Sequence, residues 1–285
     1  MISADLTGNL GNHMFQYAIT RSVAEHNGYR WGFNSTVSND YYAGKPQMDF
    51  MEIDYGETHT AKWKEMPKGI ADIWNEKYEH FDTHDFYYFQ PDIFDIKDNT
   101  KLVAPCAQDA RYYDREKLRK WFTIKKECSS YYNLILNNKD IKFNANTTII
   151  NVRGGEYKGV SSLILDIKYW QFAINHMIER NSTTNFIAIT DDVEYTKSIM
   201  PSDMNIPVFH FGIGMDYYMI NQARNLILSN SSFAIFPAWL NRHNPYVVAP
   251  RYWARHNIST GYWANSDIWA FGWEFMDREG VIHGK

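Results

Sequence analysis

Cysteine is scarce in this sequence, whose 285 residues include only Cys106 and Cys128. Two cysteines are too few for a disulfide framework, and their surroundings fit neither a CxxC redox motif nor a zinc site. Long apolar runs are also missing, because no stretch of about 18 residues is apolar enough to span a membrane. The N-terminal segment carries Asp5, whereas a secretory leader begins with basic residues. We therefore expect a cytoplasmic protein with no disulfide scaffold and no membrane span.

An excess of positive charge is lacking as well. The chain has 29 Lys and Arg against 33 Asp and Glu, which gives a net charge of −4 and a pI near 6.2. Binding to nucleic acid requires clustered cationic side chains that displace counterions from the phosphates. The composition therefore argues against a nucleic-acid partner.

Aromatic residues, by contrast, are abundant, with 20 Tyr, 17 Phe and 10 Trp. Their rings must pack against one another or line a cleft, and Tyr and Trp add hydrogen-bonding groups that suit sugar hydroxyls. At about 150 residues per domain, the length of the chain predicts roughly two domains.

The first half of the chain has regular patterns only near its two ends. The predicted elements are a strand over residues 1–6, a turn over 7–11, helices over 12–27 and 111–137, and a hinge over 144–146. Residues 34 to about 100 show no helical or strand period, so we expect irregular structure there. We place the domain boundaries at the hinge and before the Trp-rich tail, which gives segments 1–145, 146–253 and 254–285. The tail is expected to pack back onto the core.

The second half alternates strand-like and helix-like segments. Strands are predicted over 147–152, 185–190, 206–211, 226–229 and 246–248, and helices over 169–180, 192–199, 215–224 and 231–240. This alternation is typical of an α/β fold with a doubly wound parallel sheet. Ligands bind such sheets beyond the carboxyl ends of the strands, which directs attention to Arg153, Asp191 and Ser231.

Two of these positions suit an anionic ligand. Ser231, Ser232 and Phe233 open a helix after a short strand, and free N–H groups at a helix start attract phosphate. Arg153 precedes two glycines that allow a ligand to approach the backbone, while its guanidinium can bind phosphate oxygens in a fork. The alternatives are a simple helix cap at Ser231 and a salt bridge at Arg153.

The third position carries two adjacent carboxylates, Asp191 and Asp192. One of them could accept hydrogen bonds from the N–H edge of a guanine while the other caps the following helix. The alternative is that both act as caps.

Four short segments stand out as motifs: GNLGNHMFQYA at 8–18, NVRGGEY at 151–157, TDD at 190–192 and NSSFAIFPAWL at 230–240. Together they resemble glycosyltransferase family 11, the α-1,2-fucosyltransferases that use GDP-fucose. Residues 8–18 read GNLGNHMFQYA, close to the GGLGNQMFQYA opening of the family. The family's HxRRGDY, SDD and NSSFSWWAAWL segments correspond in order and spacing to NVRGGEY at 151–157, TDD at 190–192 and NSSFAIFPAWL at 230–240. The resemblance covers residues 1–33 and 146–253.

This resemblance implies a GT-B-like fold, in which two Rossmann-like domains face each other across a cleft and the C-terminal one binds the nucleotide. It implies that segment 1–145 is the acceptor side and that 146–253 holds the GDP-sugar, with no cofactor or metal needed. The absence of any Asp-x-Asp pair agrees with the last point. The implied contact residues are Arg153, Ser231, Ser232 and Phe233 for the phosphates, Asp191 or Asp192 for guanine, and Gly11 and Asn12 for donor and acceptor.

The chain departs from the family pattern next to the expected reaction centre. Asn151 replaces His, Gly154 replaces the second Arg and Glu156 replaces Asp, while His13 replaces Gln. Inverting transfer requires the acceptor hydroxyl to lose a proton, and Glu156 or His13 could be the base within reach of it, with Glu156 preferred. A loosely bonded transition state could also need little base assistance, in which case Glu156 would only orient Arg153 or the acceptor.

The resulting hypothesis is an inverting transferase that moves L-fucose from GDP-fucose to a galactose-containing glycan, at the 2-hydroxyl of galactose. The altered NVRGGEY segment leaves two alternatives open. One is a non-catalytic protein that binds a GDP-sugar or a glycan, and the other is a transferase that uses another GDP-sugar.

Overall fold

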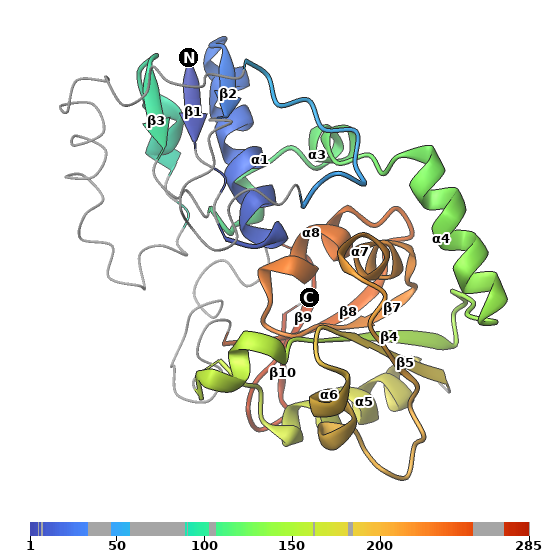
Figure 1. The fold of residues 1–285 in the computed structure, drawn as a ribbon. Helices are drawn as coiled ribbons and strands as arrows, with labels where there is room; N and C mark the ends of the chain where they lie inside the picture. The colour runs from blue at the N-terminus through green and yellow to red at the C-terminus, as the bar shows by residue number, and fades with distance from the viewer. Residues whose placement is uncertain are drawn as a thin grey trace. The chain divides into compact units, whose positions relative to one another are not determined.

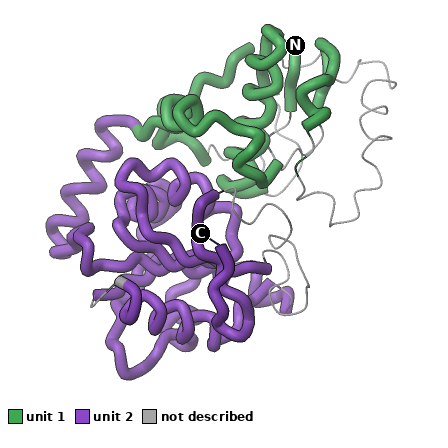
Figure 2. Tube along the Cα trace, turned by 180° about the vertical axis from the view of Figure 1, so that it is seen from behind, with its two compact units in different colours: residues 1–124 green, residues 125–285 purple. Residues whose placement is uncertain are grey.

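The structure of the chain is a computed structural model that describes residues 1–4, 6, 8–33, 47–57, 89, 91–102, 107–161, 163–181, 185–252 and 271–284. The chain forms two compact units, Met1–Ile124 and Lys125–Lys285 (Figure 2). The division between them precedes the hinge at which the sequence places its domain boundary. The roles assigned to the three predicted segments stay predictions.

The first unit contains a three-stranded parallel sheet with the order β2-β1-β3 (Figure 1). Its strands are β1 (Ile2–Ala4), β2 (Trp31–Phe33) and β3 (Thr100–Leu102), and the sequence patterns indicate only the first. Helix α1 (Leu10–Asn27) follows β1 and buries the predicted apolar positions Met14, Phe15, Ala18, Ile19 and Val23 completely. Gly28 ends this helix in the left-handed conformation, at a φ of 67°.

The single helix expected over residues 111–137 is wrong, because the structure has two helices there. They are α3 (Arg115–Trp121) and α4 (Lys126–Asn138). The Thr123 hydroxyl donates to the carbonyl of Lys120 at 2.9 Å, and Ile124 pairs with Met51 in an isolated β-bridge. The side-chain bond satisfies a carbonyl of the last turn of α3, and the bridge holds the chain extended after it.

The second unit contains a seven-stranded sheet with the order β10-β9-β8-β7-β4-β5-β6. The strands are β4 (Thr147–Val152), β5 (Asn185–Thr190), β6 (Val208–Phe209), β7 (Asn225–Ile227), β8 (Tyr246–Pro250), β9 (Glu274–Met276) and β10 (Ile282–His283). All neighbouring pairs are parallel except β9 and β10. The predicted α/β class is confirmed.

Helices cover both faces of this sheet. Figure 1 shows α5 (Ile167–Asn181) and α6 (Val193–Ile199) on one face and α7 (Ile213–Gln222) and α8 (Ser232–Leu240) on the other. Short 3₁₀ helices complete the described elements: η3 (Pro91–Asp95), η4 (Ala110–Tyr112) and η5 (Gly155–Gly159). Strand β4 pairs with β5 on one side and with β7 on the other, so the chain order of the strands reverses there. Ligands bind doubly wound sheets at such a switch point.

The C-terminal segment joins the core of the second unit. Phe271, Trp273 and Phe275 are buried, and β9 extends the parallel sheet beside β8. Residues 253–270 of the predicted tail lie outside the described residues, so its role as a whole stays a prediction.

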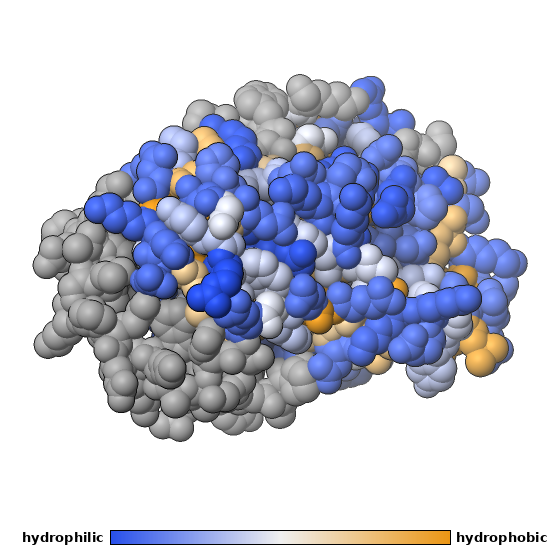
Figure 3. All heavy atoms as spheres, turned by 90° about the horizontal axis from the view of Figure 1, so that it is seen from above, coloured by the Kyte–Doolittle hydropathy of each residue, from blue (hydrophilic) through white to orange (hydrophobic). Residues whose placement is uncertain are grey.

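The described surface is mainly hydrophilic on the side drawn in Figure 3, with isolated hydrophobic residues between the polar ones. Among the helices that the structure describes, none combines the length and the apolar character needed to cross a membrane.

Candidate functional site

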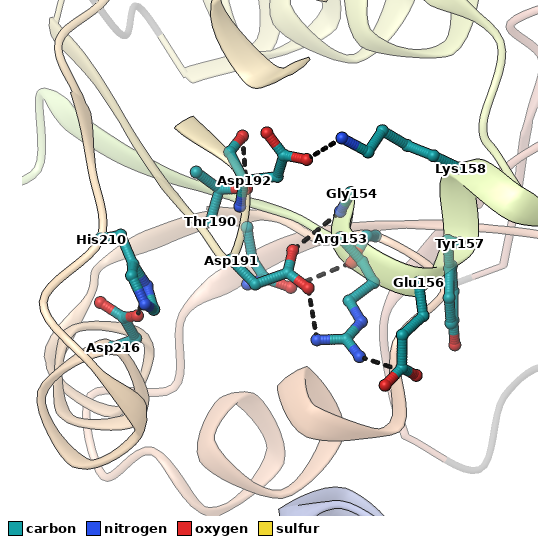
Figure 4. A network of polar contacts seen from close by, with 12 residues as sticks. Arg153, Gly154, Glu156, Tyr157, Lys158, Thr190, Asp191, Asp192, His210 and Asp216 are labelled. Carbon is teal, nitrogen blue, oxygen red and sulfur yellow. Dashed lines mark hydrogen bonds and ion pairs between the residues drawn. The ribbon is translucent and has the colours of Figure 1, made fainter. Parts of the chain in front are cut away.

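The carboxyl edge of the seven-stranded sheet gathers polar residues from four strands. Arg153 follows β4, Asp191 follows β5, His210 follows β6, and Ser231 lies in the loop after β7. Because these strands run parallel, the residues that follow them emerge at the same edge (Figure 4). Three of these positions are those that the sequence predicts.

Arg153 and Asp191 form the centre of this group. The Arg153 Nη1 lies 2.5 Å from Asp191 Oδ2, and the Gly154 backbone N–H donates to Asp191 Oδ1 at 2.8 Å. A Cβ at Gly155 would lie 2.3 Å from the same carboxylate, so any larger residue there would force this carboxylate to shift. The two side chains keep 21% and 26% of their surface exposed, which leaves the pair accessible to a ligand.

The Arg153 guanidinium is only partly satisfied. Its Nη2 lies 3.6 Å from Glu156 Oε2, and its Cζ lies 5.4 Å from the centre of the Tyr157 ring. Its Nε is buried and has no hydrogen-bond partner among the described residues. A buried donor without an acceptor costs about 1–3 kcal/mol, so this N–H group favours the arrival of an acceptor such as a phosphate oxygen. Arg153 thus forms the salt bridge of the alternative interpretation and still offers a donor.

Asp192 has a different role from its neighbour. Its Oδ1 accepts from the Tyr195 N–H at 3.1 Å and caps α6, while its Oδ2 pairs with the Lys158 ammonium. The bond from Lys158 and the bond from the Tyr195 N–H together lower the pKa of Asp192. The prediction that one carboxylate caps the helix is confirmed, whereas a guanine contact stays a prediction for both.

Two departures from the family pattern have a structural explanation. A Cβ at Gly154 would lie 2.7 Å from Tyr195 Cδ1 and 2.8 Å from Asp192 Cβ, so α6 leaves no room for an arginine there. Asn151 is buried, and its Oδ1 accepts from the Ser229 hydroxyl at 3.0 Å. This bond links β4 to the loop after β7. The Asn151 side chain is therefore used in a buried hydrogen bond within the unit.

The loop after β7 places the start of α8 at the switch point. Ser231 is the N-cap of α8, is buried and makes no capping hydrogen bond with its side chain. The first turn, which holds Ser232 and Phe233, contains no acidic residue. Asn230 fixes the loop, because its Nδ2 donates to the Leu163 carbonyl at 2.9 Å. The helix dipole therefore stays available for an anion.

His210 and Asp216 form a further polar pair at this edge that the sequence patterns do not single out. His210 Nδ1 lies 3.2 Å from Asp216 Oδ2, and the Phe211 N–H donates to Asp216 Oδ1 at 3.2 Å. Burial raises the pKa of Asp216 to about 6, although hydrogen bonds from His210 and the backbone oppose this rise. The strand predicted over 206–211 is wrong at both ends, because β6 covers only Val208–Phe209. His210 therefore follows a strand, as Arg153 does.

The predicted residues of the first unit lie at the start of α1. Asn9 is its N-cap, Gly11 is buried, and Asn12 is half-buried. His13 is buried, its Nε2 has no hydrogen-bond partner among the described residues, and burial lowers its pKa. A neutral imidazole can accept a proton, so the base role of His13 stays a prediction, as do the roles of Gly11 and Asn12.

Among the described residues, no group of three or more His, Cys, Asp or Glu side chains lies close enough together to hold a metal ion. One group of residues that could in principle bind a metal, His80, Asp82, His84 and Asp85, lies outside the described residues.

Comparisons with known proteins agree with the motifs. The model of the family described as Glycosyl transferase family 11 matches residues 1–277. The O-antigen biosynthesis glycosyltransferase WbnK of Escherichia coli is 25% identical, over 88% of this chain and 94% of that protein. The alpha-1,2-colitosyltransferase of the same species is 25% identical, over 89% of this chain and 92% of that protein. The crystal structure of the fucosyltransferase NodZ from Bradyrhizobium shares the fold, with a TM-score of 0.52 at 13% identity over 84% of this chain and 91% of that one. This chain belongs to glycosyltransferase family 11.

Proposed function

We propose that this protein is an inverting fucosyltransferase that transfers L-fucose from GDP-fucose to the 2-hydroxyl of a galactoside in a glycan. The observation that carries the proposal is the partly satisfied Arg153 guanidinium at the switch point of the sheet. Its buried Nε–H and the start of α8 are two features that favour an anion, and a nucleoside diphosphate leaving group is such an anion. Membership of a glycosyltransferase family supports the reaction class.

In the proposed reaction, the acceptor hydroxyl oxygen attacks C1 of fucose on the face opposite to the diphosphate. The C1–O bond to the β-phosphate breaks, and its electron pair leaves with GDP. Arg153, Ser231 and the first turn of α8 stabilise the negative charge that develops on the leaving group. No residue of the sequence is required to hold a metal in this scheme.

Glu156 is the proposed base that takes the acceptor proton. Its side chain is 52% exposed and lies beside Arg153, so the carboxylate is accessible to a ligand that binds at Arg153. The proposal includes the GT-B-like arrangement, with Gly11, Asn12 and His13 of the first unit approaching donor and acceptor. It also includes the cytoplasm as the place of action.

A second candidate donor comes from the comparisons. One relative is an alpha-1,2-colitosyltransferase, so a transferase that uses another GDP-sugar is the second candidate. Asn151 and Gly154 differ from the family pattern. A third candidate is therefore a protein that binds the nucleotide sugar without catalysing its transfer.

Release of GDP tests these candidates together. The purified protein is incubated with GDP-fucose or GDP-mannose, with and without galactose-terminated oligosaccharides, in the presence of EDTA. Acceptor-dependent release from GDP-fucose alone supports the proposal, and release from GDP-mannose alone supports a different donor. Binding of GDP without turnover on any acceptor supports the non-catalytic candidate, and failure to bind GDP rejects all three.

A further inference from the structure

His210 lies at the same edge as the proposed donor site, two strands away from Arg153. In the ladder between β5 and β6, Ile189 lies opposite Phe209, so His210, the first residue after β6, lies level with Thr190, the last residue of β5. Figure 4 shows His210 and Asp191 on neighbouring segments beyond the ends of these strands. His210 therefore belongs to the edge where a ligand of Arg153 and Asp191 would lie.

Asp216 fixes the orientation of the imidazole. One carboxylate oxygen faces His210 Nδ1, and the other accepts the Phe211 N–H, so the carboxylate has little freedom to rotate. The Asp216 side chain is only 8% exposed, whereas that of His210 is 48% exposed. A carboxylate beside Nδ1 favours the tautomer with its proton on Nδ1. The outer nitrogen, Nε2, has no hydrogen-bond partner in the described part of the chain and is left for a ligand.

The position of His210 fits the direction in which a nucleotide extends. Neighbouring strands are about 4.8 Å apart, so the two steps from β4 to β6 cover about 10 Å along the edge. A nucleotide whose phosphates lie at Arg153 and at the start of α8 can place its nucleoside over β5 and β6. Asp191 and His210 offer polar groups along that path.

We propose that His210, oriented by Asp216, contacts the nucleoside of the donor through Nε2 and thereby contributes to selection of the nucleotide. His210 is the binding residue, and Asp216 is a positioning residue that acts through it. This inference rests on the proposed function, because it assumes that the anionic part of a nucleotide binds at Arg153.

The test compares ligands that have or lack a nucleoside. Isothermal titration calorimetry measures the affinity for GDP, and displacement of GDP measures the affinity for inorganic pyrophosphate. Loss of one hydrogen bond corresponds to about a three- to tenfold weaker affinity. We expect His210→Ala to weaken GDP binding by this factor and to leave pyrophosphate binding unchanged. His210→Gln provides a second variant that keeps a polar side chain if the alanine variant does not fold.

His243→Gln is the matched control, because His243 is an exposed histidine of the same unit that precedes β8. Equal GDP affinity in the wild type and both His210 variants would overturn the inference, as would an equal loss for GDP and pyrophosphate. If the wild-type protein binds neither ligand, the proposed function fails with it. If Arg153→Ala weakens both ligands while the His210 variants weaken neither, only the inference fails.

Asp216→Asn tests the positioning role. In the wild-type background it should weaken GDP binding less than His210→Ala, without affecting pyrophosphate. Combined with His210→Ala, it should cause no further loss of GDP affinity, because the residue through which it acts is already removed. A further loss in the double variant would show that Asp216 affects the nucleotide independently and would overturn its assigned role.

Discussion

The two edges of the seven-stranded sheet use polar residues in opposite ways. At the amino edge, Asn225 Nδ2 donates to the Ala145 carbonyl at 2.7 Å, and Asn185 Nδ2 donates to the Thr147 hydroxyl at 3.2 Å. Tyr246 and Glu274, the first residues of β8 and β9, form a third group with His176 of α5. His176 Nε2 lies 2.7 Å from the Tyr246 hydroxyl and 2.8 Å from Glu274 Oε2.

At the carboxyl edge, fewer of the polar groups are satisfied by partners within the unit. Arg153 has a buried Nε without a partner among the described residues, and His210 is half-exposed. At the amino edge, by contrast, Glu274 is 7% exposed, and its carboxylate is bonded to the side chains of His176 and Tyr246 of the same unit. Both edges belong to one sheet, so the difference does not come from fold class. Groups that satisfy one another stabilise the fold, whereas groups left accessible and partly satisfied can bind a ligand.

The largest effect is expected for Arg153→Ala. Removal of a preorganised charged donor should lower the rate of acceptor-dependent GDP release by about 10²- to 10³-fold. Arg242→Ala is the control, because Arg242 is an exposed arginine that precedes β8 at the other edge. Turnover of Arg153→Ala within about twofold of the wild type would contradict the role of the carboxyl edge.

Glu274→Ala should affect stability rather than binding. Its removal leaves the His176 imidazole and the Tyr246 hydroxyl without their shared acceptor, which costs about 1–3 kcal/mol, so the free energy of unfolding in urea should fall by about this amount. GDP affinity, measured at urea concentrations below the unfolding transition, should remain that of the wild type. Glu179→Ala, at an exposed position of α5, provides the control. A large loss of GDP affinity in folded Glu274→Ala would remove the distinction between the edges.

Gly155→Ala sharpens the comparison within the carboxyl edge. The new Cβ would lie 2.3 Å from Asp191 Oδ2, so the carboxylate must shift, which disturbs its pairing with Arg153. A shift of this kind should weaken GDP binding by about tenfold, since misplacement by about 1 Å can cost up to 10²-fold in activity. Gly159→Ala is the control in the same 3₁₀ helix, because nothing lies within 4 Å of its added Cβ. Equal affinities of the two variants would argue against a precise Arg153–Asp191 geometry.

A further prediction concerns the pH dependence of stability. The pKa of Asp216 is raised from 3.8 to about 6 by burial, so the folded protein keeps a proton that the unfolded chain loses between these values. Stability contributed by this carboxyl group therefore falls as the pH rises from about 4 to 6. Asp216→Asn cannot ionise, so its free energy of unfolding relative to the wild type should rise across this window. Urea unfolding at several pH values checks this, with Asp203→Asn as an exposed control; a constant difference for Asp216→Asn would contradict the shifted pKa.

Part of this site can be predicted from the sequence. Strands β4 and β5 have the predicted bounds because continuous apolar segments end at charged residues, Arg153 and Asp191. The same rule misses His210, because Phe209 and Phe211 flank it and make residues 206–211 resemble one longer strand. The helix over 111–137 is another failure, because the pairing of Ile124 with Met51 depends on residues far apart in the sequence.

The sequence alone determined the alternation of strands and helices, the family motifs and the residue types at the ends of the strands. These follow from apolar periodicity and local turn chemistry, which act between residues close in the chain. The tertiary structure decided that Asp191 holds Arg153 while Asp192 caps α6, that α6 closes position 154, and that His210 pairs with Asp216. Such relations depend on the order of strands and on the space between side chains, which come into existence only when distant segments pack together.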